Sequence, residues 1–148
     1  MSRRAALILG VLVVVSVGAY FYLQSLVYHP VVRLALPDGL SITAVLPATK
    51  ERNACSTANE RFVAPFKQCK ECKIVVASCD HQLQPLELAM REGRAVSHPV
   101  VIAQELRIAV IGPPEAAKAG CKVIAADMVA KGMKSATCVT PQSPSPKS

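Results

Sequence analysis

The longest apolar stretch of the chain lies near its N-terminus, at residues 5–27, and contains no charged side chain. A helix of this length, at about 1.5 Å per residue, covers the roughly 30 Å hydrocarbon core of a bilayer. A soluble protein would need a large body to bury a helix that is apolar on every side. The pattern therefore predicts a single transmembrane helix.

The residues around this segment indicate its orientation. Arg3 and Arg4 precede it without an acidic neighbour, so the positive-inside rule places a stub of residues 1–4 in the cytoplasm and the rest of the chain outside. The alternative is a signal peptide cleaved after Val17-Gly18-Ala19, which resembles a signal-peptidase site. Both interpretations export the remaining chain.

Downstream of this segment, the apolar pattern predicts one domain at residues 29–140, followed by a disordered Pro- and Ser-rich tail at 141–148. Apolar, β-branched runs predict strands at residues 31–36, 40–46, 74–77, 99–103, 106–111 and 135–140. The run at 74–77 is continuously apolar, which is typical of a strand buried on both faces. The runs at 99–103 and 106–111 are either two strands or one long bent strand.

Capping and proline signals predict three helices between these strands. Thr57 and Glu60 fit a capping box, and Pro65 limits the helix that they begin. A second, short helix is expected at 83–92. The third begins at Gly112-Pro113-Pro114-Glu115 and carries an apolar face at Ala117, Cys121, Ile124 and Met128.

Strands that alternate with helices predict an α/β layered domain with a mainly parallel sheet. An internal similarity favours this fold: residues 42–47 (ITAVLP) resemble residues 108–113 (IAVIGP). Each of these sequences precedes a helix that contains a cysteine and a strand that contains another. Two βαβ-like halves would explain the similarity, and a chance resemblance is the alternative.

All six cysteines lie in the exported part: Cys55, Cys69, Cys72, Cys79, Cys121 and Cys138. An even number of cysteines outside the cytoplasm predicts structural disulfides. The internal similarity pairs Cys121 with Cys138. It makes Cys55 and Cys79 the corresponding pair of the first half. Cys69 and Cys72 then bond to each other, unless one of them exchanges with Cys55.

The charge of the chain restricts its partners. The net charge is +7, and Arg3 and Arg4 supply two of these charges, which leaves the exported part at about +5. This mildly basic domain could favour an anionic glycan or lipid headgroup. We expect no nucleic acid partner, because the chain lacks a dense basic run interleaved with aromatic residues.

The Cys69-Lys70-Glu71-Cys72 sequence has three interpretations. The simplest is a local structural disulfide. A thiol–disulfide oxidoreductase is the second, because Lys67, Lys70 and Lys73 would favour the thiolate. A zinc site is the third, since Cys69, Cys72, Cys79 and His81 have tolerable ligand spacing.

The remaining chemistry is sparse. His29, His81 and His98 are scattered and are expected at the surface, and most acidic residues neighbour a basic one. No nucleophile elbow or carboxylate pair is evident, and Gly112-Pro113-Pro114 is expected to be a rigid start to a helix rather than a phosphate site. The sequence thus predicts no catalytic, cofactor-binding or metal-ligating residue.

These observations predict a non-catalytic accessory or binding protein of the bacterial envelope. It would be held in the inner membrane and assemble with an envelope protein partner of a polysaccharide, secretion or transport machine. One alternative is a membrane-tethered thiol–disulfide oxidoreductase that uses Cys69 and Cys72. The other is a single-lobe module that binds a solute or a metal.

Overall fold

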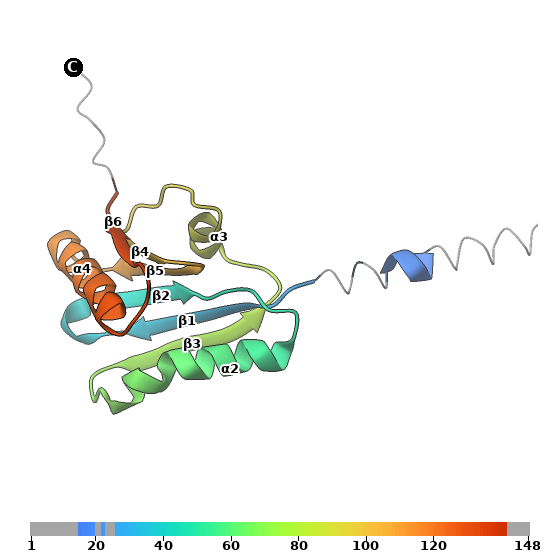
Figure 1. The fold of residues 1–148 in the computed structure, drawn as a ribbon, viewed down its shortest axis with the longest axis horizontal. Helices are drawn as coiled ribbons and strands as arrows, with labels where there is room; N and C mark the ends of the chain where they lie inside the picture. The colour runs from blue at the N-terminus through green and yellow to red at the C-terminus, as the bar shows by residue number, and fades with distance from the viewer. Residues whose placement is uncertain (1–14, 20–21, 23–25, 142–148) are drawn as a thin grey trace, which may run out of the picture.

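The computed structural model describes residues 15–19, 22 and 26–141 (Figure 1). Within these residues, no helix has both the length and the apolar character needed to cross a bilayer. Residues 15–19 are helical. Most of the predicted span at 5–27, the stub at 1–4 and all but the first residue of the predicted tail at 141–148 lie outside the described residues.

The domain is built from strands joined by three α-helices and two short 3-10 helices (Figure 1). Its strands are β1 (His29–Ala35), β2 (Ser41–Val45), β3 (Lys73–Asp80), β4 (Val100–Ala103), β5 (Leu106–Ile111) and β6 (Thr137–Val139). Its helices are η1 (Pro37–Gly39), α2 (Arg52–Val63), η2 (Ala64–Gln68), α3 (Pro85–Arg91) and α4 (Pro114–Ala130).

The six strands form one sheet in the order β3-β1-β2-β5-β4-β6, and every neighbouring pair is antiparallel. The predicted mainly parallel sheet is therefore wrong. The crossover through α2 does return β3 in the same direction as β2, but the two strands do not pair because β1 lies between them. The crossover through α4 is split in the same way, since β4 lies between β5 and β6. Each half is thus a split βαβ unit, in which the strand that comes first in the chain lies between the two parallel strands. This inserted strand is β1 in the first half and β4 in the second.

The two halves meet at an approximate two-fold axis. Strands β2 and β5 pair with Thr43 opposite Ala109, at equivalent positions of the similar sequences. Cys55 and Cys121 follow these two residues at the same distance along the chain, and both side chains are fully buried. The internal similarity of the sequence therefore corresponds to a repeated unit, although the sheet that it builds is antiparallel.

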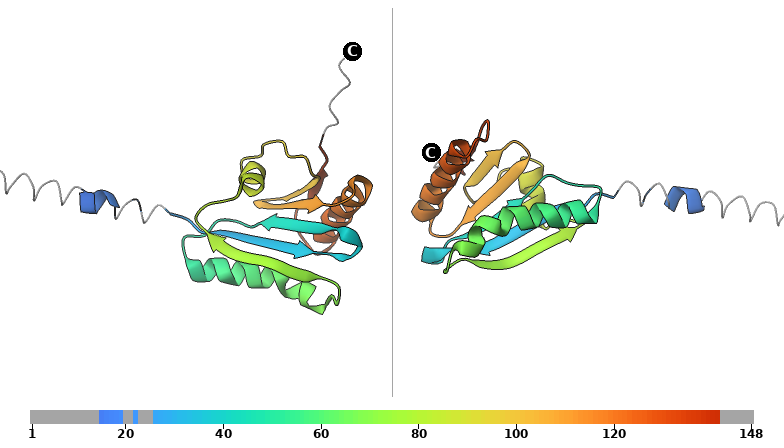
Figure 2. Two further views of the ribbon diagram at one scale, coloured as in Figure 1. Left: turned by 180° about the vertical axis from the view of Figure 1, so that it is seen from behind. Right: turned by 60° about the horizontal axis from the view of Figure 1, so that its bottom comes forward.

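The main core lies between one face of the sheet and the helices α2 and α4, and α3 covers part of the other face (Figure 2). Ala117 and Cys121 of α4 are buried, and Ile124 and Met128 pack against the same core, as the apolar face predicted. A smaller cluster joins Met90 of α3 to the opposite face.

Two expected elements differ from the structure. Helix α2 begins at Arg52, so the Thr57–Glu60 capping box does not start it. Strand β3 was expected to be buried on both faces, but it lies at the edge of the sheet, where Ile74 and Val75 are 45% and 64% exposed. The apolar runs at 99–103 and 106–111 form two separate strands, β4 and β5.

Three disulfides join Cys55 to Cys79, Cys69 to Cys72 and Cys121 to Cys138, the pairs that the sequence predicted. The first and third bonds occupy equivalent places, because each ties the crossover helix of one half to its returning strand. The second closes a turn between η2 and β3. Disulfides form and persist in oxidising compartments, so they indicate that the domain is extracytoplasmic.

Candidate functional site

The free edge of β3 is the longer of the two edges of the sheet. It is an eight-residue strand, whereas β6 at the opposite edge has only three residues. An edge strand presents unpaired amide and carbonyl groups to which another strand can add. A one-residue bulge occurs where β3 passes between Arg33 and Leu34 of β1, so the regular part of the edge begins at Val76.

The hydrogen bonds of β1 show which backbone groups of the sheet are already used. Leu46 N donates to Pro30 O at 3.0 Å, and Leu36 N donates to Leu40 O at 2.8 Å. These bonds lie at the two ends of the β1–β2 ladder. In an antiparallel pair, alternate residues direct their backbone groups to the same neighbour. The even-numbered residues of β1 therefore face β2, and the odd-numbered residues face β3.

The outward groups of β3 follow from this alternation. The odd-numbered residues of β1 lie opposite Val76 and Ser78, whose backbone groups consequently point inward. Ala77 and Cys79 then direct their amides and carbonyls to the free edge. The site thus offers two donors and two acceptors in the spacing of a β-ladder.

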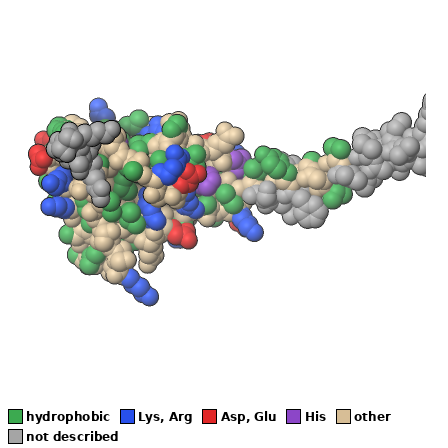
Figure 3. Space-filling view, turned by 90° about the horizontal axis from the view of Figure 1, so that it is seen from above, with side chains coloured by type: hydrophobic (Ala, Val, Ile, Leu, Met, Phe, Trp, Pro, Cys, Tyr) green, Lys and Arg blue, Asp and Glu red, His purple; other side chains and the backbone are tan. Residues whose placement is uncertain are grey.

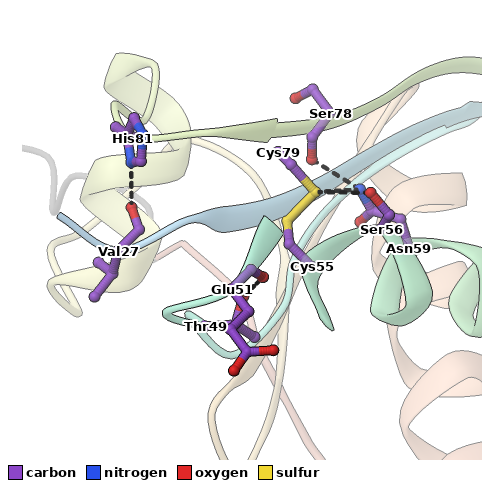
Figure 4. The surroundings of a disulfide bond; sticks show 9 residues. All are labelled: Val27, Thr49, Glu51, Cys55, Ser56, Asn59, Ser78, Cys79 and His81. Atoms are coloured by element: carbon purple, nitrogen blue, oxygen red, sulfur yellow. Dashed lines mark hydrogen bonds between the residues drawn. A yellow bond between two sulfur atoms is a disulfide. The ribbon is translucent and has the colours of Figure 1, made fainter. Parts of the chain in front are cut away.

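Helix α2 supports this edge from one face of the sheet. The Asn59 side chain is buried, and its Nδ2 donates to the Ser78 carbonyl at 2.8 Å and approaches Cys79 Sγ at 3.6 Å (Figure 4). The Cys55–Cys79 disulfide covalently ties the same strand to the same helix. These contacts hold the edge in place without using the outward groups of Ala77.

A groove runs along the other face of β3 and β1, beneath α3 and the loop that precedes it. Its volume is about 680 Å³, and its walls include the side chains of Val76, Ser78, Asp80, His81 and Arg33. Val76, Ser78 and Asp80 are alternate residues of the edge strand. The groove therefore lies where side chains of an added strand would project.

An ion pair anchors α3 over the groove. Arg33 Nη2 lies 2.5 Å from Glu87 Oε1 and donates to Gln84 Oε1 at 2.7 Å. Glu87 Oε2 accepts a hydrogen bond from the backbone N–H of Gln84 at 2.8 Å, which completes a capping box at the start of α3. The Glu87 side chain is 4% exposed and that of Arg33 is 33% exposed, so one partner is buried and the other borders the groove.

The end of the domain next to residues 26–28 is also ordered by polar contacts. The backbones of Tyr28 and Thr49 exchange two hydrogen bonds, and the ring centroids of Tyr28 and His81 lie 4.2 Å apart. His81 Nδ1 contacts Val27 O at 3.0 Å (Figure 4). In Figure 3, histidine side chains lie where the chain leaves this end. The segment that enters the domain is therefore fixed beside the β3–α3 loop.

His29 lies at this end in a setting that disfavours its charged form. Its Nδ1 atom is buried and has no hydrogen-bond partner among the described residues. Burial lowers the pKa of His29, and the charges of Arg91 and His81 lower it further. The expectation of three surface histidines holds for His81, which is exposed, whereas His29 and His98 are half-buried.

Arg91 also compensates for a proline in the sheet. Pro30 has no amide hydrogen, so it cannot donate to the carbonyl of Leu46, its partner in the β1–β2 ladder. Arg91 Nη1 donates to that carbonyl instead, at 3.2 Å. The last residue of α3 thus completes the hydrogen bonding of the central strands.

The Cys69–Cys72 turn lies after η2 and directly before β3. Both cysteines are half-buried, in contrast to Cys55 and Cys121, which are fully buried. Cys69 N donates to Phe66 O at 3.1 Å, at the C-terminal end of η2. In thiol oxidoreductases of the thioredoxin type, the reactive cysteine occupies the opposite end of a helix.

The four residues of the alternative zinc site do not form a cluster, because Cys79 is bonded to Cys55 rather than placed beside Cys69 and Cys72. No group of three or more potential ligands occurs in the part of the chain that the structure describes. Gly112 and Pro113 precede α4 as a rigid turn: a Cβ on Gly112 would lie 2.7 Å from the Leu40 side chain.

Sequence reasoning missed the exposure of β3 and the Arg33–Glu87 pair. The pair joins residues 54 positions apart, and neither residue carries a local signal for the other. No family model, no curated protein and no solved structure matches this chain.

Proposed function

We propose that this chain is an accessory protein of the bacterial envelope, anchored in the inner membrane by residues 5–27, whose periplasmic domain binds a partner protein. The apolar N-terminal sequence supports the anchor. The three disulfides support an oxidising compartment for the domain. In this role the domain binds its partner without catalysing a reaction.

The observation that carries this proposal is the long free edge of β3 next to the groove. An extended segment of a partner can add to such an edge, where backbone hydrogen bonds provide affinity and side-chain pockets provide specificity. Ala77 and Cys79 supply the backbone groups. Arg33, Ser78 and Asp80 supply polar contacts in the groove.

The proposal is tested by crosslinking the full chain in native membranes. A photoreactive amino acid at Val75, on the exposed edge, should yield one discrete adduct with an envelope protein. The matched control is Val123, which is 67% exposed but lies on α4. Equal adducts from both positions, or none from Val75, would refute binding at this edge.

A backbone variant distinguishes strand addition from simple proximity. Ala77→Pro removes an outward amide, whereas Ala77→Ser keeps it, so only the proline variant should lose the Val75 adduct. Formation of the Cys55–Cys79 bond in both variants shows that the edge is still folded.

The topology has its own test. A periplasm-dependent reporter enzyme fused after Ser148 should be active in cells. Activity of a cytoplasm-dependent reporter at the same position would contradict the anchored, exported arrangement.

A further inference from the structure

The Cys69–Cys72 turn differs from the other two disulfides in its relation to the fold. The Cys55–Cys79 and Cys121–Cys138 bonds each join a helix to a strand and include a fully buried cysteine. The Cys69–Cys72 bond joins residues three positions apart, and both of its cysteines are half-buried. Opening it would leave the helix–strand connections of both halves intact.

Three lysines lie within two residues of Cys69 or Cys72 in the sequence. Lys67, Lys70 and Lys73 are exposed, and none of them takes part in the ion pairs found among the described residues. Glu71 is the single acidic residue among them. Nearby ammonium groups stabilise a thiolate and so lower the pKa of the thiol. The C-terminal end of η2 acts in the opposite sense, but this helix is only five residues long.

We propose that Cys69 and Cys72 form a redox-active site that exchanges with the dithiol of a partner protein. A partner thiolate attacks Cys69 Sγ, which breaks the Cys69–Cys72 bond and forms a mixed disulfide while Cys72 leaves as a thiolate. The second thiolate of the partner then attacks the partner sulfur of that mixed disulfide, and Cys69 leaves. The partner loses two electrons and two protons, and Cys69 and Cys72 gain them as two thiols.

This activity is independent of strand addition at the β3 edge, because the sulfurs lie in the turn that precedes the strand. The three lysines favour a partner whose cysteines lie in an acidic segment. Each exchange leaves the partner with a disulfide and this chain with a dithiol. The disulfide of a second protein would then re-oxidise Cys69 and Cys72 by the same exchange, and it would take up the two electrons and two protons.

The first test is a redox titration of the full-length protein in detergent. The protein is equilibrated in dithiothreitol buffers of graded potential, its thiols are trapped with a maleimide, and the modified cysteines are mapped by mass spectrometry. We expect Cys69 and Cys72 to become labelled at a less reducing potential than the other four cysteines. A single common transition, or opening of this pair last, would overturn the proposal.

The second test isolates the role of the lysines. In Cys72→Ser, the pH dependence of Cys69 alkylation by neutral iodoacetamide gives the thiol pKa, which should lie below the ordinary value of about 8.5. Adding Lys67→Gln and Lys70→Gln should raise that value. Lys118→Gln and Lys122→Gln on α4 are the matched control and should not change it. Equal values in all three backgrounds would show that the turn is an ordinary structural disulfide.

Discussion

The three disulfides close loops of very different length, which predicts a hierarchy of stability losses. The loops span 24 positions for Cys55–Cys79, 17 for Cys121–Cys138 and three for Cys69–Cys72. We consider three double variants, in which both cysteines of one pair are replaced by alanine. Each variant removes one constraint on the unfolded chain and leaves the other two bonds in place.

The expected magnitudes follow from the entropy of loop closure. That relation gives about 3.5 kcal/mol for the longest loop, about 3 kcal/mol for the second and about 2 kcal/mol or less for the shortest. The first two variants also shorten a fully buried side chain, at Cys55 or Cys121, which adds a packing loss. Since domains are stable by only about 5–15 kcal/mol, either loss is a large fraction of the total.

The assay is urea unfolding of the full chain in detergent, followed by far-ultraviolet circular dichroism. We expect the Cys55/Cys79 and Cys121/Cys138 variants to lose stability by similar amounts and the Cys69/Cys72 variant to lose clearly less. If removal of Cys69–Cys72 costs as much as removal of either long-range bond, the reasoning from loop length is wrong. Such a result would also contradict the view that this turn is independent of the core.

Three further changes test contacts described above. Arg91→Met should destabilise the domain by about 1–3 kcal/mol, measured by urea unfolding, because the Leu46 carbonyl loses its hydrogen-bond donor. An unchanged urea midpoint would show that water replaces the guanidinium as the donor. The folded domain binds a proton at His29 less readily than the unfolded chain does, so the free energy of unfolding should be highest above the ordinary pKa of about 6.5 and should fall as the pH drops below it. His29→Gln should flatten this pH dependence, measured by thermal unfolding. An equally steep profile in the variant would exclude His29 as its cause. Gly112→Ala should lower thermal stability by about 1–3 kcal/mol, because Gly112 has φ of 154°, whereas Gly120→Ala, with ordinary contacts only, should not.

Local signals in the sequence predicted much of the secondary structure and the cysteine pairing. The turn at Pro37–Gly39 produced a hairpin, with Asp38 and Gly39 both at positive φ, and the Pro-Pro-Glu start produced α4. The pairing of Cys121 with Cys138 followed from a helix that is buried on its cysteine face. These features depend on residues close in sequence or on a repeated spacing.

The strand order could not be predicted in this way. A helix between two strands is compatible with direct parallel pairing or with a split crossover, and the choice depends on where the preceding strand inserts. Here the hairpin formed by β1 and β2 leaves one side of β1 free, and β3 pairs there. No residue within β3 indicates which strand it pairs with, so its apolar run alone predicts a buried strand.

The two halves of the domain share one scaffold, and the first half carries additional features. Both halves keep the inserted strand, the crossover helix and the helix–strand disulfide, so these features serve the fold. The first half differs by η2, the Cys69–Cys72 turn and an eight-residue edge, whereas the second half ends in the three-residue β6. These differences are contiguous in the chain, from residue 64 to residue 80, and they contain both the proposed partner edge and the proposed redox turn. The second half returns from α4 to β6 without a counterpart of η2 or of the Cys69–Cys72 turn, so the shared scaffold does not require these two features.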